Sequence, residues 1–478
     1  MGFVILSEFE RISKINNSKF TESQIKMSKP SIVKGTRDFG PQQMVRRNYI
    51  FGTIRSVYEK FGFQPIETPA MENLSTLMGK YGEEGDQLLF KILNSGNFSE
   101  KIGQSDLEEG YKKLTTKISE KGLKYDLTVP FARYVVMNRS DLAMPFKRYQ
   151  IQPVWRGDRP QKGRYREFYQ CDADVVGTDS LICEAEIVLM IHEVMNSFGI
   201  NFSLKINNRK ILTGLSEAIG AVGQEGSLAV AIDKLDKIGK EKVLEELAEK
   251  GFSQDSLSKL DPIFEIAGTN KEKFLKLEEL FENSETGKQG INELKQVWDY
   301  LSAFGLSEEN IELDITLARG LSYYTGAIFE VKALGVQIGS ITGGGRYDNL
   351  TGTFGAPGLS GVGISFGVDR IYDVMEELNL FPNNQSVTTK LLFCHFGKEE
   401  LNYALPLLQM ARLAGLNSEV YPDISKIKKQ LDYADRKQIP YVCIIGSEEM
   451  KSGKLTLKNM ISGEQEVLDF EEILSKLG

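Results

Sequence analysis

The chain has 478 residues and a net charge of −8 at neutral pH, with 26% charged and 41% hydrophobic side chains. At roughly 150 residues per domain this length predicts about three domains, and the acidic balance argues against non-specific binding of nucleic acid by the whole surface. The four cysteines form no Cys-x-x-Cys pair, which argues against a disulfide framework or a zinc site and favours a reducing, cytoplasmic setting. No apolar run approaches the roughly 18 residues of a membrane-spanning helix.

The N-terminal part begins without a clear pattern. Residues 1–30 are expected to be a disordered extension, and Met27 is a candidate for the true start. Over residues 42–61, apolar side chains recur three and four positions apart, which predicts a helix that ends at Gly62. An extended segment follows and reaches Pro69.

A run of strong positive charge lies further along the chain. It is preceded by a stretch with few apolar residues, 94–121, which predicts a mobile loop or hairpin, and by a predicted helix at 130–138. From Lys147 to Glu167 the chain carries seven basic residues against two acids, and its alternating pattern predicts two antiparallel strands joined by a basic loop. Arginines on such a rigid hairpin present planar forks to phosphate. A solvated charged face explains the charge alone equally well.

The middle of the chain changes composition twice. A helix is predicted at residues 181–197, and residues 208–305 are rich in Lys, Glu and Leu with helical periodicity, which predicts an inserted helical module. Glycine and β-type residues return over 311–367, where we expect short strands, and a helix begins at residue 368. The glycines near the end of this region nearly match a dinucleotide-binding fingerprint, but they lie inside a strand pattern.

The C-terminal part reads as a separate small domain. Residues 381–388 have the composition of a linker, and residues 389–478 alternate apolar strands with helices, which predicts an α/β domain with a mostly parallel sheet. The chain has only two histidines, His192 and His395, and they are far apart in the sequence. A histidine-based mechanism or a His-rich metal centre is therefore disfavoured.

Five segments, in the order of the family, resemble motifs of the class II aminoacyl-tRNA synthetases and, within that class, of the histidyl-tRNA synthetase family. Three resemble the motifs of the class and two resemble segments specific to the histidine family: residues 62–69, 155–168 and 361–370, then 169–174 and 318–324. The resemblance covers about residues 31–478.

The resemblance implies an α+β catalytic core whose antiparallel sheet is flanked by helices. The core would have two parts: residues 31–207 with motifs 1 and 2, and residues 306–380 with the histidine-specific segment and motif 3. The helical module, residues 208–305, would be inserted between them. Residues 389–478 would form a C-terminal α/β domain that binds the anticodon.

The activity implied by the resemblance is the ATP-dependent ligation of L-histidine to tRNA(His) through a histidyl-adenylate, in the cytoplasm and by a homodimer. Mg²⁺ would arrive bound to ATP, with no organic cofactor, no metal held by protein side chains alone and no membrane partner. Charge develops on phosphate oxygens in such a displacement, so catalysis needs positioning and electrostatic stabilisation rather than a protein nucleophile. A chain rich in arginine and poor in histidine fits that requirement.

The resemblance also assigns roles to individual residues. The implied catalytic residues are Arg156 and Arg319. The implied ATP-binding residues are Arg156, Asp158, Arg164, Phe168 and Arg370. The implied histidine-binding residues are Asp126, Thr128, Arg156, Gln170, Asp174, Arg319, Tyr323 and Tyr324. The implied contacts to the tRNA acceptor end are Gln161 and Arg166, and the implied dimer contact is Pro69.

Two other functions share this pattern. One is a non-catalytic paralogue of the synthetase that senses histidine as a regulatory subunit, and the other is a different ATP-dependent adenylating or ligating enzyme on the same core. The presence of Arg156, Arg319 and Arg370 favours the enzyme, and residues 318–324 favour histidine. Residues 124–134 resemble the eukaryote-like branch of the family, whereas residues 159–164 resemble the common bacterial form. This mixture leaves open how the tRNA acceptor end is read.

Overall fold

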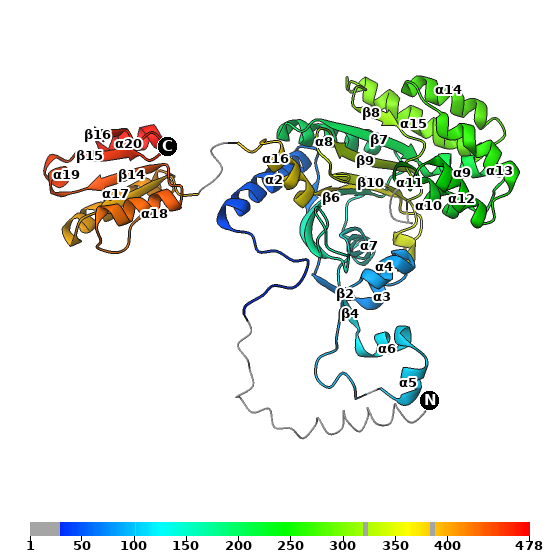
Figure 1. Ribbon diagram of the computed structural model, residues 1–478, viewed down its shortest axis with the longest axis horizontal. Helices are drawn as coiled ribbons and strands as arrows, with labels where there is room; N and C mark the ends of the chain where they lie inside the picture. The colour runs from blue at the N-terminus through cyan, green and yellow to red at the C-terminus, as the bar shows by residue number, and fades with distance from the viewer. Residues whose placement is uncertain (1–28, 101, 319–323, 383–387) are drawn as a thin grey trace.

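The structure is a computed structural model (Figure 1). It describes four stretches of the chain: residues 29–100, 102–318, 324–382 and 388–478. The N-terminal extension up to residue 28, most of the proposed linker, and the candidate residues Arg319 and Tyr323 lie outside the described residues.

An eight-stranded sheet organises the larger body. Its strand order is β1-β5-β6-β11-β10-β9-β7-β8, and neighbouring strands run antiparallel except in the two edge pairs, β1 with β5 and β7 with β8. In sheet order the strands are β1 (Gln64–Pro65), β5 (Phe146–Trp155), β6 (Glu167–Val176), β11 (Gly361–Gly367), β10 (Thr342–Tyr347), β9 (Ala327–Ala333), β7 (Phe202–Asn208) and β8 (Ile311–Leu313). The predicted antiparallel core sheet is therefore confirmed.

Strands β5 and β6 form the predicted hairpin, and residues 156–166 form the basic loop between them. Arg148 lies opposite Asp174 in the register, and Gln150 lies opposite Asp172. Because alternate residues of a strand face the same side of a sheet, these four side chains share one face. This face carries the polar side chains that line the pockets described below.

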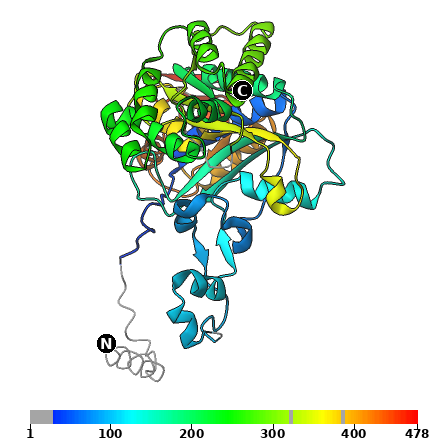
Figure 2. The same ribbon diagram turned by 90° about the vertical axis from the view of Figure 1, so that its right-hand side faces the viewer.

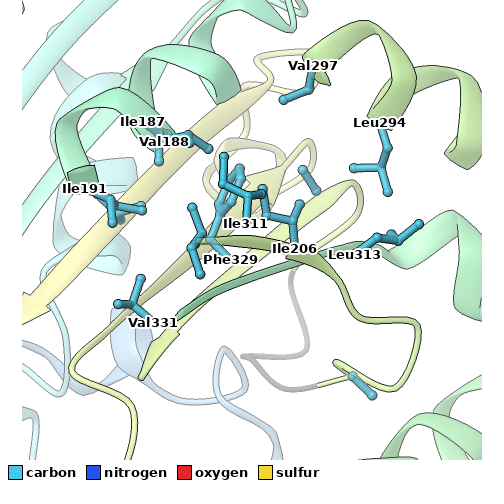
Figure 3. Close-up of a cluster of buried hydrophobic side chains, with 14 of the residues drawn as sticks. Ile187, Val188, Ile191, Ile206, Leu294, Val297, Ile311, Leu313, Phe329 and Val331 are labelled. Atoms are coloured by element: carbon cyan, nitrogen blue, oxygen red, sulfur yellow. The ribbon is translucent and has the colours of Figure 1, made fainter. Parts of the chain in front are cut away.

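Helices cover the opposite face of the sheet. The predicted helix at 42–61 is α2 (Pro41–Lys60), the predicted helix at 181–197 is α8 (Ile182–Phe198), and α16 (Val368–Glu377) packs beside α2. Figure 3 shows apolar side chains of α8 and of α15 (Glu285–Ala303) pointing toward the strands. Burial of each such side chain stabilises the fold by about 1.5–3 kcal/mol. The labelled core residues are Ile187, Val188, Ile191, Ile206, Leu294, Val297, Ile311, Leu313, Phe329 and Val331.

A helical module is inserted between β7 and β8, as the composition predicts (Figure 1). Before α15 its helices are α9 (Arg209–Ala218), α10 (Glu225–Ile232), α11 (Leu235–Ile238), α12 (Lys240–Glu249), α13 (Gln254–Leu260), the 3₁₀ helix η2 (Asp261–Glu265) and α14 (Asn270–Leu280). Its apolar faces join the core of the sheet in one continuous hydrophobic cluster. The residue boundaries of the domains stay predictions.

The stretch 94–121 differs from its prediction. It forms two short helices between β3 and β4, and it projects away from the main sheet (Figure 2). Asp106 connects the two helices: its side chain accepts a hydrogen bond from Gly103 N at 2.9 Å and pairs with Lys117 at 2.5 Å. These polar contacts are invisible to a search for apolar periodicity. The elements are β2 (Met71–Asn73), β3 (Lys91–Ile92), α5 (Gln104–Glu108), α6 (Tyr111–Ile118) and β4 (Lys121–Leu123).

Strands β2, β4 and β3 form a small three-stranded sheet in that order, and short helices lie near it. They are α3 (Leu74–Leu77), α4 (Gly82–Leu88), α7 (Thr128–Met137) and the 3₁₀ helix η3 (Thr351–Phe354). The predicted helix at 130–138 corresponds to α7. In the described parts of the chain, no helix is both long enough and apolar enough to cross a bilayer.

The C-terminal body has its own five-stranded sheet, in the order β13-β12-β14-β15-β16, and its own hydrophobic cores. Only β12 with β13 and β12 with β14 are parallel, so the expectation of a mostly parallel sheet is wrong. The short connections after β14 and β15 cannot make the crossover of a dozen or more residues that parallel pairing requires. The elements are β12 (Leu391–His395), α17 (Lys398–Leu413), β13 (Ser418–Val420), α18 (Ile427–Arg436), β14 (Tyr441–Ile445), α19 (Ser447–Ser452), β15 (Leu455–Asn459), β16 (Gln465–Leu468) and α20 (Phe470–Leu477).

Candidate active site

A cavity of about 640 Å³ opens on the polar face of the sheet, between the basic loop and the start of α16. It brings together every residue expected to bind ATP, although these residues come from segments about 200 positions apart: Arg156, Asp158, Arg164, Phe168 and Arg370. A cavity of this size lies in the usual range for small-molecule sites.

Arg156 follows β5 directly and is held by its neighbours. Its Nε donates a hydrogen bond to the carbonyl oxygen of Tyr125 at 2.9 Å. Its guanidinium lies 4.3 Å from the ring centroid of Tyr125 and 5.1 Å from that of Phe168. Among the described residues, no carboxylate lies within ion-pairing distance of Arg156. Aromatic packing fixes the guanidinium without neutralising it, which suits a residue that binds an anionic ligand.

Arg164 and Arg370 approach the same cavity from the basic loop and from α16. Arg370 donates from Nε to the carbonyl oxygen of Gly163 at 2.9 Å and from Nη1 to that of Ser340 at 2.5 Å. Arg164 is more exposed, and its Nη1 lies 3.7 Å from Asp158 Oδ1. An exposed pair at that distance contributes little, so Arg164 can turn toward an anion in the cavity at small cost.

A second, smaller pocket of about 130 Å³ lies beside the first. It contains all the described residues expected to bind histidine: Asp126, Thr128, Arg156, Gln170, Asp174 and Tyr324. Arg156, Gln170 and Tyr324 line both pockets, so the two adjoin at these residues.

The small pocket is rich in hydrogen-bond acceptors. Asp126 accepts at Oδ1 from Tyr81 and from the backbone of Val129, but its Oδ2 has no partner among the described residues. Gln170 donates to Ser365 at 2.8 Å, and its buried Oε1 likewise has no partner there. Burial raises the pKa of Asp126 above its ordinary value. Unpaired buried acceptors favour a ligand that supplies N–H groups and positive charge.

Asp174 is fixed by three neighbours. It pairs with the fully buried Arg148 at 2.7 Å and accepts a hydrogen bond from Tyr347 at 2.7 Å. Its side chain lies over Gly363, where a Cβ atom would stand 2.1 Å from Asp174 Oδ1. A glycine is therefore required there, because any side chain would collide with the Asp174 carboxylate.

Asp172, Arg148 and Tyr347 were absent from the candidates. Asp172 lines the small pocket between Gln170 and Asp174 on β6, and burial raises its pKa to about 7. The alternation of a strand was a sufficient signal for Asp172, because residues two apart share a face. The placement of Arg148 depends on strand register, which the sequence pattern did not reveal.

We expect Asp172→Asn to change how stability depends on pH. The folded protein holds the Asp172 proton up to a pKa of about 7, against 3.8 ordinarily. Stability without ligand should therefore fall as pH rises from about 4 to about 7, with this group contributing about 1.4 kcal/mol per pH unit. In thermal unfolding between pH 5 and 8, the stability of the variant relative to the wild type should rise with pH up to about pH 7 and then level off. Parallel pH curves for the two proteins would contradict the assignment.

The remaining candidates lie outside the two pockets. Gln161 is exposed at the tip of the basic loop, and Pro69 is exposed next to the buried Thr68. Arg166 lies at the base of the loop, where its Nε donates to the carbonyl oxygen of Asp158 at 3.1 Å. The roles suggested for these residues stay predictions. In the described stretches, no cluster of three or more His, Cys, Asp or Glu side chains is arranged to hold a metal ion.

Two family models match this chain. Residues 97–371 match the family model for histidyl-tRNA synthetase, and residues 387–478 match that for an anticodon-binding domain. A histidine–tRNA ligase of Cytophaga hutchinsonii is 63% identical over 452 residues, covering 94% of this chain and 100% of that protein. One from Phocaeicola vulgatus is 60% identical, covering 94% of this chain and 99% of that protein.

A solved structure gives the same result. The crystal structure of histidyl-tRNA synthetase from a Nostoc species has a TM-score of 0.80 and 32% identity, covering 95% of this chain and 99% of that chain. A Bacillus halodurans structure, described as a phosphoribosyltransferase regulatory subunit or histidyl-tRNA synthetase, has a TM-score of 0.66 and 20% identity, covering 87% and 99%. That second similarity concerns the fold alone. By sequence and by structure, the chain belongs to the histidyl-tRNA synthetase family.

Proposed function

We propose that this chain ligates L-histidine to tRNA(His) in two steps, through a histidyl-adenylate. One observation carries the proposal: a small pocket lined by acceptors adjoins an arginine-lined cavity, and Arg156 lines both. An amino acid in the first pocket and ATP in the second would meet at Arg156. The family of the chain supports the same activity.

In the first step, a carboxylate oxygen of histidine attacks the α-phosphorus of ATP, the bond to the β-phosphate breaks, and pyrophosphate leaves. Arg156 would hold the histidine carboxylate and the α-phosphate together, and Arg319 would stabilise the α-phosphate from the other side. Arg164 and Arg370 would hold the β- and γ-phosphates, and Phe168 would stack on the adenine. The protein then supplies proximity and charge stabilisation for an in-line displacement. Mg²⁺ would enter on the ATP phosphates.

Histidine recognition would depend on the buried acceptors. Asp126 and Thr128 would hold the α-amino group, because Asp126 Oδ2 has no partner among the described residues. Gln170, Asp174 and Tyr324, with Tyr323, would surround the imidazole. An analogue without the matching N–H groups would leave these buried acceptors unpaired, and such mismatches are rejected strongly.

In the second step, the terminal adenosine hydroxyl of the tRNA attacks the histidyl carbonyl carbon, and AMP leaves. Gln161 at the loop tip would face the acceptor end, with Arg166 at the base of the loop. The C-terminal domain would bind the anticodon, in keeping with its family match. We further propose that the enzyme acts in the cytoplasm as a homodimer, with the exposed Pro69 at the dimer contact.

The purified protein should catalyse histidine-dependent exchange of pyrophosphate into ATP, and then transfer histidine to tRNA(His). Exchange should depend on histidine among the twenty amino acids, because the pocket acceptors match its N–H donors. The measurement is radioactive pyrophosphate exchange without tRNA, followed by aminoacylation. Absence of exchange in a folded protein that binds histidine would favour a regulatory paralogue. Exchange with another amino acid would overturn the histidine assignment.

A further inference from the structure

The segment from Lys34 to Phe39 lies directly on the basic loop, although neither pocket includes it. The carbonyl oxygen of Gly35 accepts a hydrogen bond from Arg166 N at 2.8 Å. Gly35 has φ +89°, and a Cβ there would stand 2.8 Å from Pro160 and 2.9 Å from Arg166. Only glycine allows this close approach of the two chains.

Arg37 extends the contact in two directions. Its Nη2 lies 2.5 Å from Asp369 Oδ1, and its guanidinium lies 3.2 Å from the ring centroid of Tyr165. The side chains of Arg37 and Asp369 are 26% and 6% exposed, so this ion pair is partly shielded from water. A guanidinium over the face of an aromatic ring is attracted to it, so the stack helps to hold Tyr165 beside Arg37.

The two partners of Arg37 belong to the elements that carry the phosphate-facing arginines. Tyr165 follows Arg164 in the basic loop, and Asp369 precedes Arg370 in the first turn of α16. Both Tyr165 and Asp369 line the larger cavity. Arg37 therefore connects the two walls of that cavity from outside.

We propose that Arg37 is a positioning residue for ATP: it holds the basic loop against α16 so that Arg164 and Arg370 converge on the same phosphates. This rests on the proposed function, in which those arginines bind the β- and γ-phosphates. An exposed loop free to move would have to be ordered each time ATP binds, and that ordering costs free energy. A loop already fastened by Arg37 binds ATP without that cost.

We expect the fold to survive the removal of Arg37. Arg47 on α2 also binds Asp369 Oδ1, at 2.5 Å, and its side chain is 3% exposed. Asp369 therefore keeps a buried cationic partner in an Arg37 variant, and the large penalty of an unpaired buried charge is avoided. The contact that the variant loses is the one between Arg37 and Tyr165 of the basic loop.

The test compares three variants with the wild type. Arg37→Ala should raise the KM for ATP in pyrophosphate exchange about 10- to 100-fold, while the KM for histidine stays within about twofold. Arg37→Lys retains the charge but loses the planar stack, so its KM for ATP should lie between those of the wild type and Arg37→Ala. Arg46→Ala is the matched control: Arg46 pairs with Glu376 of α16 at 3.0 Å without contacting the basic loop. Its ATP kinetics should equal those of the wild type.

Direct binding separates this inference from the proposed function. Equilibrium titration with ATP should show weaker binding by Arg37→Ala than by wild type, whether or not exchange occurs. If the wild type binds ATP but catalyses no exchange, the proposed function fails. The positioning role is then supported by weaker ATP binding in Arg37→Ala than in the wild type. The inference is overturned if Arg37→Ala binds ATP like the wild type, if the wild type binds no ATP, or if Arg46→Ala loses ATP affinity equally. A parallel loss of histidine affinity would also overturn it, because it would indicate general destabilisation.

Discussion

Arg156→Ala should lower kcat/KM for pyrophosphate exchange about 1000-fold while leaving the protein folded. Arg156 lines both pockets. Its positively charged guanidinium can therefore stabilise both the histidine carboxylate and the negative charge that develops on the α-phosphate. Removing one preorganised group at such a position costs about 10²- to 10³-fold in rate. The measurement is exchange kinetics with histidine and ATP varied in turn, beside the thermal unfolding curve.

Two further variants define the Arg156 result. Arg156→Lys should recover only part of the activity, because an ammonium cannot make the two parallel contacts of a guanidinium. Arg159→Ala is the control: Arg159 is exposed in the same basic loop and lines neither pocket, so tRNA-independent exchange should be unchanged. Near-normal exchange by a folded Arg156→Ala protein would refute the central role of Arg156.

Asp126→Asn should raise the KM for histidine about 100-fold. The substitution keeps an Oδ1 acceptor for Tyr81 and Val129, so the local fold is retained. It replaces the carboxylate oxygen that we assign to the α-ammonium group by a donor that repels it. Losing one partner of a buried, charged hydrogen bond costs about 2–5 kcal/mol, and about 3 kcal/mol corresponds to the expected change. Exchange kinetics at varied histidine concentration measure it.

The KM for ATP provides the internal comparison, because Asp126 lines only the smaller pocket. It should stay within about twofold of the wild type. Asp141→Asn, at an exposed position beyond the end of α7, should leave both KM values unchanged. Equal losses for ATP and histidine would contradict the division of the site into two pockets.

The pattern of apolar and glycine residues was sufficient for most elements. Periodicity located α2 and α8 within a few residues, and alternation located the β5–β6 hairpin, because cores require apolar side chains at the period of each element. Prediction failed where polar contacts or the lengths of connections decide the structure. The helices α5 and α6 are organised by Asp106 and Lys117, and the antiparallel half of the C-terminal sheet follows from the length of its connections.

The candidate site was predictable in its residue types and less so in its arrangement. Resemblance of the motifs gave the arginines and most of the acceptors, and the structure collects the described ones in two adjoining pockets. Asp172 was overlooked although it shares a strand face with Asp174. Whether each residue performs its assigned role stays a prediction for the variants above.

Local periodicity and short motifs were sufficient to predict the class of fold, the family and the inventory of charged groups, because each of these is recorded in nearby residues. Which charges meet depends on the three-dimensional fold. Arg148 reaches Asp174 through strand register, and Arg37 reaches Asp369 across 332 positions of the chain. Such pairs form because a buried charge requires a partner, and folding rather than sequence distance determines which one is near.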